Sequence, residues 1–260
     1  MRLAPNGTID SEGLKLARYL SLPGGRPPTA PVPGLVFCHG FPANPLDARQ
    51  SAGTFGELMD RIANEMGWAA LTFNFRGCGE SEGDFSLRGW LTDLKAAVEH
   101  LRAEVPLSGL WLAGTSTGGS LSIVLAADDP SIRGVAALAT RADFDDWAGQ
   151  PRRFLEHARQ IGAVRDPHFP KNFDGWAREL RTYRPLEAVR RYAPRPLLVI
   201  VGDDDEVVPT ADARLLAEAH GSAELRIMTG ASHRLRHDPR AVAVLLGWLD
   251  RQRNRHPASP

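Results

Sequence analysis

The sequence predicts an α/β fold with an open, mostly parallel central sheet and helices on both of its faces. Two observations predict this class. Short apolar runs, which are typical of buried strands, alternate along the chain with segments of helical periodicity. Parallel strands also require crossover connections, which the intervening helices would supply. The 260 residues are 43% hydrophobic, which is ample for a core. We expect a single domain over residues 1–260.

The strands are expected on both sides of a turn-rich connector of glycines and prolines at residues 24–33. Before the connector, Leu14–Leu20 is expected to form an antiparallel strand at the sheet edge. After it, apolar runs of strand length recur at intervals that leave room for a helix. These runs are residues 35–38, 68–73, 110–113, 135–138, 197–201 and 225–228.

The helices are expected between these runs. Phe55, Leu58, Met59 and Ile62 have the i, i+3, i+4, i+7 spacing that places all four on one helix face. Residues 121–127 are almost entirely apolar, so this helix should be buried on all sides. The expected helices are residues 55–62, 87–101, 121–127, 211–219 and 242–249.

The segment from about residue 143 to 194 breaks this alternation. Its pattern is helical but irregular, and it is too long for an ordinary connection. We expect an inserted cap of two or three short helices over one end of the sheet. Its aromatic residues are interpreted either as the cap's own core or as an apolar pocket for an acyl or alcohol group. These residues are Trp147, Phe154, Phe169, Phe173 and Trp176.

Composition excludes several classes of protein. The 31 basic and 31 acidic residues balance, so nucleic acid is not an expected partner. No apolar run approaches the roughly 18 residues that span a bilayer, and the N-terminus lacks the apolar region of a signal peptide. Cys38 and Cys78 form neither a disulfide framework nor a metal-ligand pattern. We therefore expect a cytoplasmic protein, a monomer or homodimer, with no membrane partner, no metal and no cofactor.

Residues 114–118 read GTSTG and join an expected strand to an expected helix. A serine on such a tight turn is held in strained backbone angles, and its neighbours two residues away must be small for the turn to close. The turn raises the hydroxyl of Ser116 above the sheet edge. It also directs the N–H groups of the helix N-terminus toward the same place. This context favours a nucleophile over a flexible linker.

A serine nucleophile needs a base, and the base needs a carboxylate that orients it. His233 follows the expected strand 225–228, and the acidic residues 203–206 follow the strand 197–201, so both lie at the same sheet edge. His237 is the rival base. The residues alone do not separate Asp205 from its rivals, which are Asp203 and Asp204.

With these residues, the chain resembles the α/β-hydrolase family from about residue 35 to 249. The matching motifs are HGF at 39–41, FRGCGES at 75–81, GTSTG at 114–118, GDDDEVVP at 202–209 and GASH at 230–233. The order Ser, Asp, His is also the family's order. One departure is Asn74, where the family often has Asp at a position that is usually structural. Arg76, Glu80 and Ser81 are expected to hold their loop together below the site.

The resemblance implies the role of each site residue. Ser116 would be the nucleophile, His233 the general base and then acid, and Asp205 the orienting acid. The oxyanion of the tetrahedral intermediate needs at least two N–H donors. Elbow geometry makes the Thr117 N–H one donor, and the end of a strand at the same edge makes the Phe41 N–H the other.

The neighbours of Phe41 have simpler expected roles. Pro42 has no N–H and cannot replace it. Gly40 allows the backbone to approach the substrate closely. His39 is expected to be structural, held by hydrogen bonds within its loop.

The leading functional hypothesis is a serine hydrolase that cleaves small or medium carboxylic esters through an acyl-enzyme. A thioesterase, an acyltransferase or a peptidase would use the same residues, and a cofactor-free perhydrolase is a further alternative. A non-catalytic binding member of the fold is the alternative from another class. A dehalogenase is disfavoured, because its nucleophile would be Asp at the position of Ser116. The fold hosts many reactions, so the substrate rests on family analogy.

Overall fold

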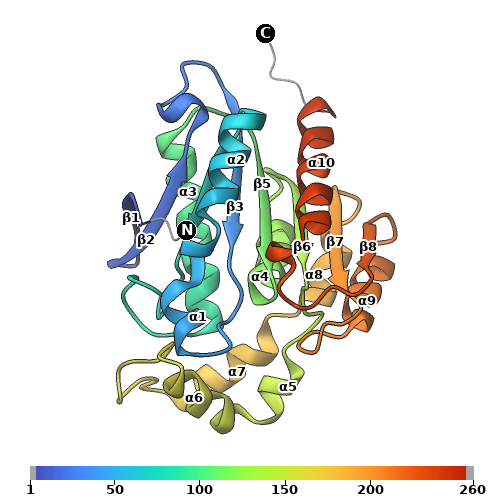
Figure 1. The fold of residues 1–260 in the computed structure, drawn as a ribbon. Coiled ribbons are helices and arrows are strands. Elements are labelled where there is room, and N and C mark those ends of the chain that lie inside the picture. Colours follow the sequence, from blue (N-terminus) through green and yellow to red (C-terminus); the bar gives the residue numbers. More distant parts are fainter. Residues whose placement is uncertain (1–3, 256–260) are drawn as a thin grey trace.

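The computed structural model describes residues 4–255, and within them eight strands form one sheet in the order β1-β2-β4-β3-β5-β6-β7-β8 (Figure 1). From β4 to β8 every neighbouring pair is parallel, whereas β2 pairs antiparallel with both β1 and β4. The expected α/β class with a mostly parallel sheet is therefore confirmed. The strands are β1 (Gly7–Ser11), β2 (Leu14–Ser21), β3 (Val32–Cys38), β4 (Ala69–Phe73), β5 (Leu107–Thr115), β6 (Ile132–Leu138), β7 (Leu197–Gly202) and β8 (Glu224–Met228).

The N-terminal strands differ from the expectation in one respect. The segment Leu14–Leu20 is antiparallel, as expected, but it is not the sheet edge, because β1 pairs along its outer side. A tight hairpin joins the two strands, with positive φ angles of 53° at Glu12 and 83° at Gly13. The sequence GTIDS of β1 has a single large apolar residue, Ile9, so it shows little strand periodicity.

The expected helices are all present, with longer bounds than the apolar patterns indicate. One further helix, α1, was not expected. Its N-terminus is capped by Asn44, whose side chain accepts from the N–H groups of Leu46 and Asp47. The α-helices are α1 (Pro45–Gln50), α2 (Gly56–Met66), α3 (Leu87–Glu104), α4 (Thr117–Asp128), α5 (Asp145–Gly149), α6 (Pro151–Gln160), α7 (Phe173–Thr182), α8 (Pro185–Tyr192), α9 (Thr210–His220) and α10 (Pro239–Arg255). Short 3₁₀ segments are η1 (Pro23–Gly25), η2 (Ser51–Thr54) and η3 (Leu235–His237).

Helices cover both faces of the sheet. In Figure 1, α2 and α10 lie on one face, and α3, α4, α8 and α9 lie on the other. Alternate residues of a strand point to opposite faces, and β3 shows this directly. Leu35 and Phe37 pack into the apolar cluster of the first face, whereas Val36 and Cys38 pack into that of the second.

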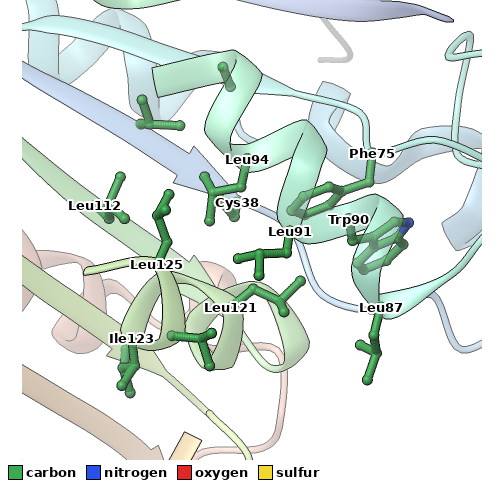
Figure 2. Packing of buried hydrophobic residues seen from close by; sticks show 14 of the residues in the cluster. Cys38, Phe75, Leu87, Trp90, Leu91, Leu94, Leu112, Leu121, Ile123 and Leu125 are labelled. Atoms are coloured by element: carbon green, nitrogen blue, oxygen red, sulfur yellow. The ribbon is translucent and has the colours of Figure 1, made fainter. Parts of the chain in front are cut away.

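Helix α4, which begins directly after Ser116, is buried along most of its length. Figure 2 shows α3 side chains, including Leu91 and Leu94, next to Leu121 and Leu125 of α4. Residues 117–126 are all buried, as the apolar pattern of this helix predicts. Packing on every side fixes α4 in place, and therefore also the residue that precedes it, Ser116.

The segment 143–194 contains four helices, α5 to α8. Helices α5, α6 and α7 lie beyond the carboxyl ends of the central strands (Figure 1). Helix α8 instead packs against α4 and α9 and so belongs to the layer that covers the sheet. The rings of Trp147 and Phe154 stack with centroids 4.1 Å apart, and Trp176 stacks beyond Phe154. These aromatic residues thus pack against one another. That the segment acts as a cap stays a prediction.

No helix within residues 4–255 is long and apolar enough to cross a membrane.

Cys38 and Cys78 are free thiols and are fully buried. Burial raises the pKa of each thiol to about 12, so both stay protonated.

Candidate active site

Ser116 occupies the sharp turn between β5 and α4. Its φ of 49° and ψ of −124° are strained for a residue with a side chain. The turn is held because the Ser116 N–H donates to the Leu138 carbonyl of β6 at 2.8 Å. No side-chain hydrogen bond caps this end of α4. The first N–H groups of the helix therefore have no side-chain acceptor.

The glycines around Ser116 are required by close backbone contacts. A Cβ on Gly114 would collide with the backbone of Gly118, and a Cβ on Gly118 would collide with the carbonyl oxygen of His39. The turn can therefore close only with glycine at both positions. This agrees with the steric argument from the sequence.

Asp205 and His233 lie on two neighbouring loops, after β7 and β8. His233 Nδ1 lies 2.8 Å from Asp205 Oδ2 and 3.1 Å from Oδ1. The backbone N–H groups of Val207 and Val208 each donate to Asp205 Oδ1 at 2.8 Å. Burial alone would raise the pKa of Asp205, but the hydrogen bonds from His233 and from these N–H groups hold it below its ordinary value. The carboxylate is therefore ionised at neutral pH.

The rival residues have other contacts. Asp203 accepts a hydrogen bond from the Gly230 N–H at 2.6 Å, and both Asp203 and Asp204 are exposed loop residues. His237 is exposed in η3 and lines a different hollow. Of the three carboxylates and two histidines considered, Asp205 and His233 are the pair that the structure joins.

The approach of the two loops depends on Gly202 at the end of β7. A Cβ at this position would overlap the carbonyl of Ala231. The Asp204 N–H donates to that same carbonyl at 3.1 Å, and the Asp203 N–H donates to Met228 at 3.2 Å. These backbone contacts hold the acidic loop against the histidine loop.

The loop after β3 lies directly beside the serine. A Cβ on Gly40 would lie 2.8 Å from the Ser116 Cβ and 3.0 Å from the Thr115 carbonyl oxygen. Phe41 and Ser116 both line one pocket, whereas Thr117 is fully buried at the start of α4. The ring of Phe41 contacts those of Phe85 and Phe154, with centroids 4.8 and 5.1 Å away.

His39 has a structural place, as expected. Its Nε2 accepts from the Phe75 N–H at 3.1 Å, so Nδ1 carries the proton that is donated to the Gly40 carbonyl at 2.8 Å. Burial lowers its pKa to about 4. A neutral His39 therefore ties the loop after β3 to the loop after β4.

The loop after β4 is held by polar side chains below the site. Asn74 Oδ1 accepts from the Ala52 N–H at 2.8 Å, which supports a structural role for this departure from the family pattern. Arg76 Nη2 pairs with Asp93 Oδ1 at 2.7 Å, and Ser81 Oγ donates to the Asn74 carbonyl at 2.6 Å. These contacts agree with the expected role of Arg76 and Ser81 in holding their loop together.

A pocket of about 210 Å³ opens at the carboxyl edge of the sheet. Ser116, Phe41 and His233 line it. Two further groups also line it, which are residues 234–236, directly after His233, and Asp47, Gln50, Ser51, Thr54 and Phe55, from α1 to the residue before α2. The sequence did not predict that these two segments meet in one pocket, because they are far apart in the chain. Within residues 4–255 there is no cluster of three or more side chains that could hold a metal ion.

The fold and this geometry define a class: an α/β protein with a strained serine on a strand–helix elbow, beside a histidine–aspartate pair at the carboxyl edge of the sheet. A family model described as the alpha/beta hydrolase family matches residues 35–245. The chain belongs to this family, and the resemblance recognised in the sequence is confirmed.

The chain is also similar to an uncharacterized protein and to a peptidase. The uncharacterized protein Rv2307c of Mycobacterium tuberculosis is 30% identical over 173 residues, which are 65% of this chain and 54% of that protein. The chain thus spans about half the length of this relative. A proline iminopeptidase of Lactobacillus helveticus is 22% identical over 276 residues, covering 84% of this chain and 90% of the relative.

Solved structures share the fold. Est1E of Butyrivibrio proteoclasticus has a TM-score of 0.70 and 21% sequence identity, and the superposition covers 99% of this chain and 100% of Est1E. Est1E has also been solved with ferulic acid bound. An esterase of Pyrococcus furiosus, Pf2001, has a TM-score of 0.67 at 17% identity, covering 96% of this chain and 93% of the esterase. These likenesses establish the α/β-hydrolase fold.

Proposed function

We propose that this protein is a serine hydrolase that cleaves carboxylic esters through an acyl-enzyme. The observation that carries the proposal is the hydrogen bond between His233 and the buried Asp205, in a site whose pocket also contains Ser116 on its strained turn. A carboxylate can only accept, so the proton of His233 lies on Nδ1 and the lone pair on Nε2. This is the tautomer that a general base requires.

In the proposed reaction, Ser116 Oγ attacks the ester carbonyl while His233 Nε2 takes the serine proton. The N–H groups of Phe41 and Thr117 would hold the oxyanion. Collapse of the tetrahedral intermediate breaks the bond to the alcohol, which leaves with the proton from His233. Water then attacks the acyl-enzyme, gives a proton to His233, and releases the acid while the proton returns to Ser116.

The test is hydrolysis of p-nitrophenyl esters of increasing acyl length, with the wild type beside Ser116→Ala. We expect turnover by the wild type and a loss of about 10⁴-fold or more in the variant, with folding intact. If neither protein turns over, labelling with a fluorophosphonate distinguishes the remaining cases. A labelled Ser116 supports a hydrolase of narrower specificity, whereas no label supports a non-catalytic member of the fold.

A peptidase is the second candidate, because the Lactobacillus relatives are named proline iminopeptidases. An aminopeptidase must bind a free α-ammonium group, which needs carboxylates. Among the residues that line the pocket, Asp47 is an acid but Arg234 and Arg236 are bases. Asp47 is also contacted by Arg234 at 3.4 Å. This charge favours the esterase, and hydrolysis of a prolyl anilide beside the p-nitrophenyl esters tests the choice.

For the segment 143–194, we propose that α5 to α7 form the cap of this site. Its support is their position beyond the carboxyl ends of the strands (Figure 1) and the contact between the rings of Phe41 and Phe154. Through this contact, a movement of α6 would reach the loop that carries one oxyanion donor.

A further inference from the structure

The pocket that contains Ser116 is also lined by a guanidinium group that the proposed ester chemistry does not use. Arg236 lies in η3, three residues after His233, and both residues line the pocket. Its side chain is half-buried, and its Nε–H is fully buried without a hydrogen-bond acceptor. Buried polar groups in folded proteins nearly always have partners. The protein within residues 4–255 therefore leaves this guanidinium short of acceptors, and a ligand in the pocket could supply them to its Nη groups, which are not fully buried.

The charges around Arg236 do not neutralise it. Arg234, which is exposed, lines the same pocket, and its guanidinium contacts Asp47 at 3.4 Å. Asp47 Oδ2 also accepts from Asn44 at 2.9 Å. No carboxylate within residues 4–255 forms an ion pair with Arg236, whose neighbour is instead the ring of Phe55, at 5.8 Å from the guanidinium carbon.

The surroundings of Arg236 disfavour its positive charge. Burial and the positive charge of Arg234 lower the pKa of Arg236, and the attraction of Asp47, which raises it, is smaller and does not compensate. A guanidinium does not lose its proton at neutral pH, so the charge remains and is poorly solvated. An anion that enters the pocket would relieve this cost. A carboxylate fits best, because its two oxygens match the planar fork of the guanidinium.

We propose that Arg236 binds a carboxylate of the substrate, so that the preferred substrates are small esters that carry a second, ionised carboxyl group. The inference rests on the proposed function, because it places this group in the same pocket as Ser116. The pocket of about 210 Å³ is smaller than the roughly 300–1,000 Å³ that is usual for drug-sized ligands. The anionic part of the substrate is therefore compact.

The test compares esters with neutral analogues of the same shape. Para-acetoxybenzoate and para-acetoxybenzamide place the charge on the alcohol side, and monoethyl glutarate and ethyl glutaramate place it on the acyl side. We expect the wild type to prefer the anionic member of one pair by about 10- to 100-fold in kcat/KM, since a hydrogen bond to a charged group contributes an effect of this order. The pair that shows the preference identifies which side of the ester faces Arg236.

Two variants assign the preference to Arg236. Arg236→Gln should remove it, mainly through a higher KM for the anionic ester. Arg226→Gln is the matched control and should keep the preference, because Arg226 lies on β8 outside the pocket and its partner Glu224 retains Arg251. A structural role of Arg236 would lower kcat/KM for both members of a pair by the same factor, and that result would overturn the inference. Equal rates for both members in the wild type would overturn it as well.

The inference and the proposed function can fail separately. If the wild type hydrolyses all four esters without preference, the hydrolase stands and the carboxylate site does not. If it hydrolyses none, fluorophosphonate labelling of Ser116 tests the proposed function. Calorimetric titration of Ser116→Ala with glutarate and with para-hydroxybenzoate then tests the carboxylate site. Binding that disappears on adding Arg236→Gln supports the site, and no binding of either anion overturns it.

Discussion

The imidazole of His233 is held by a carboxylate that has no contact with solvent. The Asp205 side chain is 0% exposed and that of His233 is 26% exposed, with Nδ1 and Oδ2 2.8 Å apart. One end of the imidazole is thus fixed inside the protein. The loop N–H groups of Val207 and Val208 fix the carboxylate in turn. Rotation of His233 away from the pocket would therefore leave a buried charge without its partner.

Asp205→Asn should lower kcat by about 10⁴-fold with little change in folding. The amide that replaces the carboxylate can donate to Nδ1, which moves the proton of His233 to Nε2 and removes the lone pair that a base needs. The measurement is steady-state hydrolysis of a p-nitrophenyl ester, with circular dichroism to check the fold.

Asp203→Asn and Asp204→Asn are the matched controls. The carboxylate of Asp203 is exposed and accepts from the Gly230 N–H, away from His233. Its loss should change kcat only a few-fold. Losses of equal size in all three variants would contradict the assignment of Asp205 as the orienting acid.

The stability of the fold should fall between pH 6.5 and pH 4 because of His39. Its pKa is lowered by burial from 6.5 to about 4. In this interval the unfolded chain binds a proton at His39 that the folded chain does not bind, so the free energy of unfolding decreases as the pH falls. The effect of this one residue is about 3 kcal/mol in total, complete near pH 4.

The measurement is urea denaturation at several pH values for the wild type and for His39→Gln, whose amide can also donate and accept. The variant should lose less stability than the wild type as the pH falls from 7 to 4.5, whatever its stability at pH 7. His168→Gln, at an exposed histidine, should keep the wild-type slope. Parallel curves for the wild type and His39→Gln would show that His39 is protonated in the folded protein.

The parts of the site that the sequence could predict are the local ones. The elbow around Ser116 closes through the contact of Gly114 with Gly118 inside the turn, so its motif is visible in five consecutive residues, although Gly118 also meets the distant His39 carbonyl. The choice of Asp205 over Asp203 needed the resemblance to the family. Which of the three acids faces His233 depends on the course of the loop backbone. The N–H groups of Val207 and Val208 donate to the Asp205 carboxylate and hold it in this orientation.

Long-range features could not be predicted in the same way. Helix α1 has one buried residue, Ala48, and an exposed Leu46, so no apolar face marks it in the sequence. The position of Arg236 in the pocket depends on the approach of η3 to the segment 47–55, which is almost 200 residues earlier in the chain. A lone arginine near a histidine motif gives no sign of this approach.

Asp93→Asn should destabilise the fold by about 3 kcal/mol or more, because it breaks a buried ion pair and leaves Arg76 with only the exposed Glu12, at 3.3 Å, as its counter-charge. The Asp93 side chain is 0% exposed and accepts from Arg76 Nη2 at 2.7 Å and from Ser11 Oγ at 2.7 Å. The measurement is the free energy of unfolding in urea. Asp250→Asn, which removes an exposed pair with Arg253, should cost less than about 1 kcal/mol. Similar losses for the two variants would contradict this role of Asp93.

Gly40→Ala should impair catalysis far more than stability. The added methyl carbon would lie 2.8 Å from the Ser116 Cβ and 3.6 Å from its Oγ, so either the nucleophile or the Phe41 N–H must move. A displacement of about 1 Å in a catalytic group can cost about 100-fold in rate. We therefore expect kcat to fall by about 100-fold, with a parallel fall in the rate of fluorophosphonate labelling. Gly149→Ala is the control, because a Cβ there meets no atom within 4 Å, and it should leave both rates unchanged. Wild-type labelling of Gly40→Ala would mean that the loop after β3 can shift without moving Ser116, and that this loop does not fix the nucleophile.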